Sequence, residues 1–335
     1  GLLADDAGRE GVANAMASMM IKGAAGRTAD DISRRLEDLG AQLGTNSGNS
    51  TFYVTGQCLS RDWRTVLGLM ADVIQRPDFP ADEWSKMQPR LLAAIASQND
   101  HWAGQLRNAF REAYFGEHPW SRPIVGRAEV VRELAASDLR EFHRARIAAP
   151  DGVLAVFGDI DPDAVRSEVE RLFGEMPAEA AEPFERKAPD PTTGRLVQVA
   201  TQRPPAAAQI GFAPGLARNN PDYGSVLVMT KVLSNFPVGW FEQALRGSGE
   251  GLVYAVGAGQ MTGMVPGYWA VLFNTHSPQQ VPEAMNEALA VIERIKTQPV
   301  DEPTLNRART AALVGEALGV QSNGQRAAEA ALDEL

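Results

Sequence analysis

The chain has 335 residues, enough for two domains of ordinary size, and 44% hydrophobic with 22% charged residues is the composition of a globular protein. A formal net charge of -10 argues against nucleic acid as a partner, because phosphates require clustered Lys and Arg. No stretch approaches the roughly 18 apolar residues of a membrane span, and no basic amphipathic helix is visible, so we expect no insertion into a membrane.

Apolar residues at helical spacing dominate the first part of the chain. A helix is predicted from Arg9 to Lys22, and a second begins at Thr28, where Asp31 completes a capping-box pattern, and ends at Gly40. The other elements expected here are a strand at Thr51–Cys58, a helix capped by Ser60, a helix after Pro80 that Pro89 should kink, a helix at Gln105–Phe115 and a short helix ending near His143.

The remainder of the chain mixes strands and helices around a linker rich in Pro, Ala and Glu. Because strict βαβ alternation is missing, we predict an α+β fold of two similar domains, each a largely antiparallel sheet with helices packed on one face. The predicted domains are residues 1–175 and 194–335, with the linker at 176–193. The expected elements are a buried strand at Gly152–Asp159, a helix at Asp161–Phe173, strands at Leu196–Thr201 and Gln209–Phe212, a helix at Pro221–Leu233, a hairpin of Leu252–Ala258 and Gly267–Thr275, and helices at Gln279–Lys296 and Glu302–Leu318.

The two ends give no targeting information. Gly1–Asp6 contains neither an initiator Met nor a signal-peptide pattern, and Ala331–Leu335 lies in a helical pattern without a C-cap. We therefore expect both ends to be cuts through a longer protein, with the second domain truncated. The compartment is left open, with the periplasm favoured over the cytoplasm.

The cysteine and the histidines form no recognisable metal site. Cys58 is the only cysteine, so no internal disulfide can form, and its predicted strand indicates a small buried side chain. None of His101, His118, His143 and His276 lies three to five residues from another, as a helical zinc pair would. We expect surface or turn positions for all of them.

The segment most informative about function is Gly11–Gly23, with the sequence GVANAMASMMIKG. It resembles the pitrilysin/insulinase family of zinc peptidases, in the branch that includes mitochondrial processing peptidase, where this stretch carries H-x-x-E-H before a short apolar run and Lys-Gly. The similarity continues, in order and spacing, through Leu36–Ala41, Pro77–Pro80, Gly116–Trp120 and Val156–Asp159.

Zinc chemistry explains the spacing of that motif. Two His side chains four residues apart lie on one helix face and bind one zinc ion, and the Glu takes a proton from the zinc-bound water. The resemblance places the two His positions at Asn14 and Ser18, the base at Ala17, and a third ligand, a Glu in the family, near Ala93 and Ala94. An amide and a hydroxyl are weak, neutral donors that cannot replace imidazoles. We therefore expect no zinc in this chain and no hydrolysis by the chain alone.

A second segment resembles the part of the family that closes over the active site. It consists of Phe241–Arg246 followed by Gly251–Tyr254. In the family, its Arg and Tyr bind the substrate backbone and stabilise the oxyanion opposite the zinc, and the resemblance assigns these roles to Arg246 and Tyr254. The intervening Gly247–Glu250 makes their separation slightly longer than in the family, which bears on the assignment of Arg246.

The resemblance implies a non-catalytic subunit, or the inactive half of a longer chain, of a bacterial-type zinc metalloendopeptidase. The implied partner is a homologous subunit or domain that carries the zinc, as in a heterodimer, and the implied substrate is a peptide or unfolded polypeptide. The alternative is a scaffold or peptide-binding protein of the same fold without a peptidase role. An intact H-x-x-E-H upstream or in an adjacent gene would distinguish the two.

Overall fold

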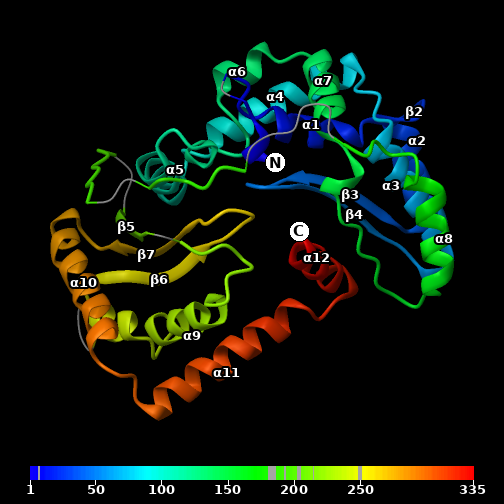
Figure 1. Ribbon diagram of the computed structural model, residues 1–335. Coiled ribbons are helices and arrows are strands. Elements are labelled where there is room, and N and C mark those ends of the chain that lie inside the picture. The colour runs from blue at the N-terminus through cyan, green and yellow to red at the C-terminus, as the bar shows by residue number, and fades with distance from the viewer. Residues whose placement is uncertain (7, 180–185, 192–193, 202–204, 214, 248–250) are drawn as a thin grey trace. The chain divides into compact units, whose positions relative to one another are not determined.

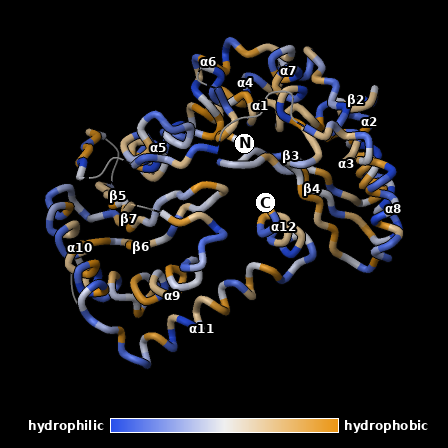
Figure 2. Tube along the Cα trace, in the orientation of Figure 1, coloured by the Kyte–Doolittle hydropathy of each residue, from blue (hydrophilic) through white to orange (hydrophobic). Residues whose placement is uncertain are grey.

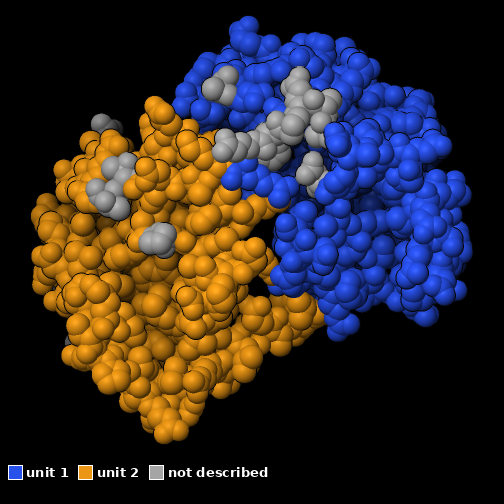
Figure 3. Space-filling model, viewed as in Figure 1, with its two compact units in different colours: residues 1–97, 122–186, 322–335 blue, residues 98–121, 187–321 orange. Residues whose placement is uncertain are grey.

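The computed structural model describes residues 1–335 except 7, 180–185, 192–193, 202–204, 214 and 248–250. The chain divides into two compact units, coloured separately in Figure 3: unit 1 comprises residues 1–97, 122–186 and 322–335, and unit 2 comprises residues 98–121 and 187–321. Each unit combines separate stretches of the chain, so the linear domain boundaries stay a prediction, and part of the predicted linker lies outside the described residues. Of the helices in the described part, none is long and apolar enough to cross a membrane.

Unit 1 is an α+β unit in which helices pack against short antiparallel strands (Figure 1). Strands β3 and β4 form a hairpin whose register runs from Gln42 opposite Gln57 to Ser47 opposite Phe52. The elements are α1 (Val12–Met20), β1 (Gly23–Ala24), β2 (Arg27–Thr28), α2 (Ala29–Leu39), β3 (Gln42–Ser47), β4 (Phe52–Gln57), α3 (Trp63–Gln75), α4 (Ala81–Ser97), α6 (Ala128–Glu133), α7 (Ala136–Arg146), α8 (Pro162–Phe173) and α12 (Asn323–Glu334).

Helix α2 shows how local sequence determines an element. The Thr28 hydroxyl accepts a hydrogen bond from the backbone N–H of Asp31, and the Asp31 carboxylate accepts one from the N–H of Thr28. Gly40 ends the helix with a φ of 57°, a conformation that costs glycine no side-chain clash. The capping box and the glycine stop predicted from sequence are both confirmed.

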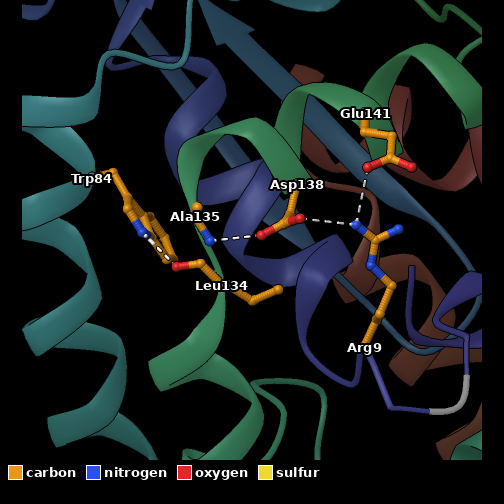
Figure 4. A network of polar contacts seen from close by, with 6 residues as sticks. All are labelled: Arg9, Trp84, Leu134, Ala135, Asp138 and Glu141. Carbon is orange, nitrogen blue, oxygen red and sulfur yellow. Dashed lines mark hydrogen bonds and ion pairs between the residues drawn. The ribbon is translucent and has the colours of Figure 1, made fainter.

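The core of unit 1 surrounds α1, and α7 packs against this helix. Figure 4 shows the polar contacts at the N-terminus of α7, where Asp138 accepts hydrogen bonds from the backbone N–H of Ala135 at 2.7 Å and from Arg9 at 3.2 Å. Arg9 also contacts Glu141, and the Trp84 indole N–H donates to the carbonyl of Leu134 at 2.9 Å. Because the Trp84 contact is buried, it contributes more to fixing this corner than the partly exposed ion pairs of Arg9.

Unit 2 contains an antiparallel sheet of strand order β5-β7-β6 with helices packed against it. Its apolar core combines β7 residues such as Val271 and Phe273 with Phe241, Leu245 and Ala288. The elements are α5 (Trp102–Phe115), β5 (Ala206–Phe212), α9 (Tyr223–Leu233), a π-helix (Glu242–Arg246), β6 (Val253–Met261), β7 (Tyr268–Thr275), α10 (Val281–Thr297) and α11 (Glu302–Gly319). The predicted α+β class is correct for both units.

Two predicted strands are wrong. Residues 152–159 and 196–201 form no ladder with any described segment, and their apolar side chains are exposed: Val156 by 37%, Phe157 by 45% and Leu196 by 73%. An apolar run predicts a buried strand only where other strands pair with it. The sequence of the run does not show whether such partner strands exist.

Two histidines expected at surface or turn positions are buried. His118 does lie in the turn after α5, but it is only 9% exposed, and its Nδ1 accepts a hydrogen bond from the backbone N–H of Trp120 at 3.2 Å. His143, on α7, is 7% exposed, and its Nε2 lies 2.7 Å from the carbonyl oxygen of Ile74. Burial lowers the pKa of both imidazoles, because the charged form is poorly solvated there.

The lowered pKa of His143 predicts a pH-dependent stability of unit 1. The unfolded chain binds the proton more readily than the folded chain, so the free energy of unfolding should fall as the pH drops below about 6.5. His143→Gln keeps a side-chain N–H donor without this titration and should flatten the profile. Urea unfolding followed by circular dichroism between pH 7 and 5 measures the difference, and His101→Gln, at an exposed histidine, is the matched control.

Candidate functional site

The helix that carries the motif positions, α1, begins at a tightly packed N-terminus. Its N-cap Gly11 has a φ of 96°, and a Cβ there would lie 2.7 Å from the Cα of Gly126, so no side chain fits. The carboxylate of Asp5 accepts hydrogen bonds from the backbone N–H groups of Gly11 at 2.6 Å and Ala13 at 3.1 Å. Burial raises the pKa of Asp5 to about 7. Asp5 thus satisfies donors that the start of a helix leaves without partners.

Three of the four motif positions lie on α1, and two of them share one face. Among its nine residues, Asn14 and Ser18 are the ones that are not buried, and they are one turn apart on the same face. The Ser18 hydroxyl donates to the carbonyl oxygen of Asn14 at 2.8 Å, so it is engaged by the main chain of its own helix. Ala17 is fully buried in the helix interface. The helix face on which the motif would place two metal ligands is therefore present, but the side chains on it are an amide and a hydroxyl.

The fourth position is on α4, which packs against α1 through Trp84 and Leu91 in the same core. Ala93 and Ala94 are exposed, and the Ser97 hydroxyl donates to the carbonyl of Ala94 at 3.0 Å. Methyl groups at these positions provide no oxygen or nitrogen ligand. In the described part of the chain, no group of three or more His, Cys, Asp or Glu side chains could hold a metal ion. The donors at these positions do not fit a zinc ion, which requires imidazole, thiolate or carboxylate ligands.

The second candidate site is in unit 2, where Arg246 ends the π-helix. A Cβ at Gly251 would lie 2.5 Å from the carbonyl oxygen of Arg246, and the N–H of Leu252 donates to Leu245 at 2.9 Å. The chain therefore returns against the end of the π-helix three residues before Tyr254. Of the intervening residues, 248–250 lie outside the described part. The exposed Arg246 guanidinium lies 5.1 Å from the ring centroid of Phe236, within cation–π range.

Tyr254 lies at an irregularity of the sheet. Val253 pairs with Thr275 and Ala255 with Asn274, so Tyr254 is the additional residue of a β-bulge. The N–H of Ala255 donates to the Asn274 side chain at 3.2 Å. The Tyr254 side chain is 68% exposed, and its ring centroid lies 6.4 Å from that of His276. A bulge turns a side chain out of the regular alternation, and here it directs a phenol into solvent.

The structure brings Arg246 and Tyr254 to one corner of unit 2, whereas Asn14, Ala17, Ser18 and Ala94 lie in unit 1. Two neighbours of this corner were not foreseen from the sequence: Phe236, a 70% exposed aromatic residue beside Arg246, and the placement of His276 beside Tyr254. The available signal for Phe236 was a large apolar residue within a Pro- and Gly-containing segment between two helices. For His276 there was none, because only the hairpin register places it beside Tyr254.

The two α+β units place the residues that the resemblance singles out on α1 and α4 of unit 1 and at the π-helix and β6 of unit 2, in the order expected of a peptidase-like fold. Residues 1–128 match the model of insulinase, peptidase family M16, and residues 133–312 match that of the peptidase M16 inactive domain. The chain belongs to peptidase family M16.

Similar proteins agree with this membership. The chain is 27% identical over 186 residues to an uncharacterized zinc protease of Mycobacterium bovis, covering 56% of this chain and 42% of that protein. A peptidase M16 inactive domain structure from Pseudomonas fluorescens has a TM-score of 0.83 at 20% identity, covering 99% of this chain and 79% of that one. A protease from Helicobacter pylori has a TM-score of 0.81 at 15% identity, covering 98% and 80%. The chain spans less than half of the zinc protease, so the whole protein's activity does not follow from this match.

The capping of α1 predicts a stability effect. Asp5→Ala leaves the buried N–H groups of Gly11 and Ala13 without their acceptor, which should lower the free energy of unfolding by about 1–3 kcal/mol. Asp30→Ala, at an exposed position of α2, should change it by less than about 0.5 kcal/mol. Urea unfolding of both variants makes the comparison, and equal effects would show that Asp5 does not support α1.

The geometry of the α1 face predicts that metal binding can be restored in part. Asn14→His with Ser18→His places two imidazoles one turn apart, and the double variant should bind Zn²⁺ at least about tenfold more tightly than either single variant, because the second ligand acts within the molecule. Isothermal titration calorimetry measures the affinities. Zinc binding by the unmodified chain that equals the double variant would contradict our account of the site.

Proposed function

We propose that this chain is a non-catalytic subunit or half of a zinc metalloendopeptidase, working with a homologous subunit or domain that carries the zinc. In this proposal the chain forms part of the wall of the substrate chamber and supplies Arg246 and Tyr254 to the partner's site. The substrate is a peptide or an unfolded segment of polypeptide.

The observation that carries the proposal is the exposed Tyr254 at a β-bulge, three residues after the glycine that lies against Arg246. Other aromatic side chains of the sheet in unit 2 are buried, such as Trp269 at 7% and Phe273 at 1% exposure. The ring of Tyr254 is 68% exposed. Sheet bulges and π-helical turns both occur frequently next to functional sites, and this corner contains one of each.

The chemistry available at this corner suits a peptide under attack. The Arg246 guanidinium carries five N–H donors in a fixed plane and can donate to the carbonyl oxygens of an extended peptide. The Tyr254 hydroxyl can donate to the carbonyl oxygen on which negative charge develops. The positions on α1 and α4 offer neither a zinc ligand nor a base, so the partner would provide both.

Replacing one hydroxyl tests the proposal directly. In the reconstituted complex with the zinc-bearing partner, Tyr254→Phe should reduce kcat for peptide hydrolysis by roughly 10²-fold, the usual cost of removing one oxyanion donor. Binding of the partner should be unaffected, because an exposed hydroxyl does not support the fold. Initial rates on a fluorogenic peptide, with zinc content measured per complex, give the result.

The matched control is Tyr53→Phe, which removes a hydroxyl from a 48% exposed tyrosine of β4 in unit 1 and should leave kcat unchanged. Equal rates for Tyr254→Phe and the unmodified complex would refute the role of Tyr254. Absence of a zinc-bearing homologous domain from the full-length protein, together with absence of any such subunit among the proteins that co-purify with it, would favour the scaffold alternative.

A further inference from the structure

The loop Ser234–Gly239 of unit 2 presents an aromatic side chain at an exposed tip. It follows α9, a largely hydrophobic helix (Figure 2), and it precedes the π-helix that ends at Arg246. Leu233 before the loop and Phe241 after it are both 0% exposed, whereas Phe236 within the loop is 70% exposed. The loop therefore rises from the core of unit 2 between two fully buried residues.

Main-chain hydrogen bonds fix the shape of this loop. The backbone N–H groups of Val238 and Gly239 both donate to the carbonyl oxygen of Asn235, at 2.8 and 2.9 Å. A Cβ at Gly239 would lie 2.5 Å from the backbone nitrogen of Asn235, so the closely turned chain has room for no side chain there. Exposure of the tip thus does not mean that the loop lacks a defined conformation.

The π-helix holds the loop at both ends. Near the start of the loop, the Ser234 hydroxyl donates to the buried carboxylate of Glu242 at 3.2 Å. Near its end, the side-chain amide of Gln243 donates to the carbonyl oxygen of Val238 at 2.9 Å. Because Glu242 and Gln243 are the first residues of the π-helix that ends at Arg246, the loop and Arg246 belong to one connected piece of structure.

The contact between Phe236 and Arg246 joins the tip of the loop to the end of the π-helix. The guanidinium carbon lies 5.1 Å from the centroid of the Phe236 ring, within the range of a cation–π interaction. A long Arg side chain at a surface moves among many rotamers, and fixing it when a ligand binds costs free energy. A guanidinium held on a ring that is itself fixed has lost part of this freedom in advance.

We propose that Phe236 is a positioning residue for Arg246, and that its ring orients the guanidinium before a peptide binds. The inference rests on the proposed function, in which Arg246 donates hydrogen bonds to the main chain of the substrate. An aromatic ring is required at this position, because the attraction for the cation comes from the negative face of the ring and not from apolar character alone. The ring acts through Arg246 and needs no contact of its own with the substrate.

Replacing the ring in the reconstituted complex with the zinc-bearing partner tests the proposal. Phe236→Leu keeps an apolar side chain and removes the aromatic face, so kcat/KM should fall about 2–5-fold, which corresponds to one exposed cation–π contact. The loss should lie in KM, because Arg246 binds main chain and Tyr254 acts on the developing charge. Phe236→Trp should retain the unmodified kcat/KM, since Trp offers the best ring for a cation. Leu313→Ala, at a 71% exposed position of α11, is the control and should change neither constant.

A double-mutant cycle determines whether Phe236 acts through Arg246. Arg246→Gln removes the cation and should raise KM about tenfold or more, as expected for a lost hydrogen bond from a charged donor. In the Arg246→Gln background, Phe236→Leu should have no further effect, because no guanidinium is left to orient. A direct contact of Phe236 with the substrate would instead give equal losses in both backgrounds.

The contact itself can be measured without a partner or a substrate. In the chain labelled with isotopic arginine, the NMR signal of the Arg246 Nε–H group is assigned by its loss in Arg246→Gln. The ring current of Phe236 should shift this proton upfield in the unmodified chain. Phe236→Leu should remove the shift, and Leu313→Ala should leave it in place.

The outcomes separate this inference from the proposed function. If Arg246→Gln raises KM while Phe236→Leu has no effect, or has the same effect in both backgrounds, the positioning role is overturned and the proposed function stands. An Arg246 signal that is identical in the unmodified chain and in Phe236→Leu would also overturn it, because the ring would not hold the guanidinium. If Arg246→Gln and Tyr254→Phe both leave the kinetics unchanged, the proposed function fails, and the positioning role fails with it.

Discussion

Unit 1 depends on the burial of helix α1. Seven of the nine residues of this helix are buried, and Met16, Met19 and Met20 lie in the centre of the core with at most 1% exposure. Burying such a helix requires that its first N–H groups find acceptors, and Asp5 provides them from outside the helix. The close contact of Gly11 with Gly126 then fixes where the helix starts. The packing of α1 therefore determines the directions in which Asn14, Ala17 and Ser18 point.

The packing of α1 also shows why its fold does not depend on metal ligands. The two positions at which the resemblance places imidazoles are the least buried on α1, so Asn14 and Ser18 need not fill a core volume. Ala17 lies at the buried base position, where a small apolar side chain is easily accommodated and a carboxylate would need a partner. Metal binding contributes to folding where the core is small. In unit 1, the apolar contacts of α1 with α4 and α7 stabilise the fold without a metal ion.

Local sequence signals predicted local structure well. The Thr28–Asp31 capping box and the Gly40 stop depend only on nearby residues, and the structure contains both. Features that depend on distant residues were not predictable. The apolar run Val153–Phe157 forms no ladder with the described chain, and the buried His143 has its Nε2 beside the carbonyl oxygen of Ile74, which the distant helix α3 supplies. In unit 2, the bulge at Tyr254 arises from the register between β6 and β7, which no pattern within β6 reveals.

The two candidate sites differ in how regular their backbone is. Positions on α1 lie on a regular helix whose geometry is maintained by packing, so a change of side chain alters the chemistry and leaves the backbone in place. Arg246 and Tyr254 lie at a π-helix and a bulge, where the backbone departs from the regular forms that would give better hydrogen bonds. Departures of this kind need support from their surroundings, and Gly251 against Arg246 and Asn274 bonded to Ala255 provide it. The exposed Arg246 and Tyr254 are therefore positioned by main-chain contacts of their neighbours, whereas Asn14 and Ser18 are positioned by the packing of a whole helix.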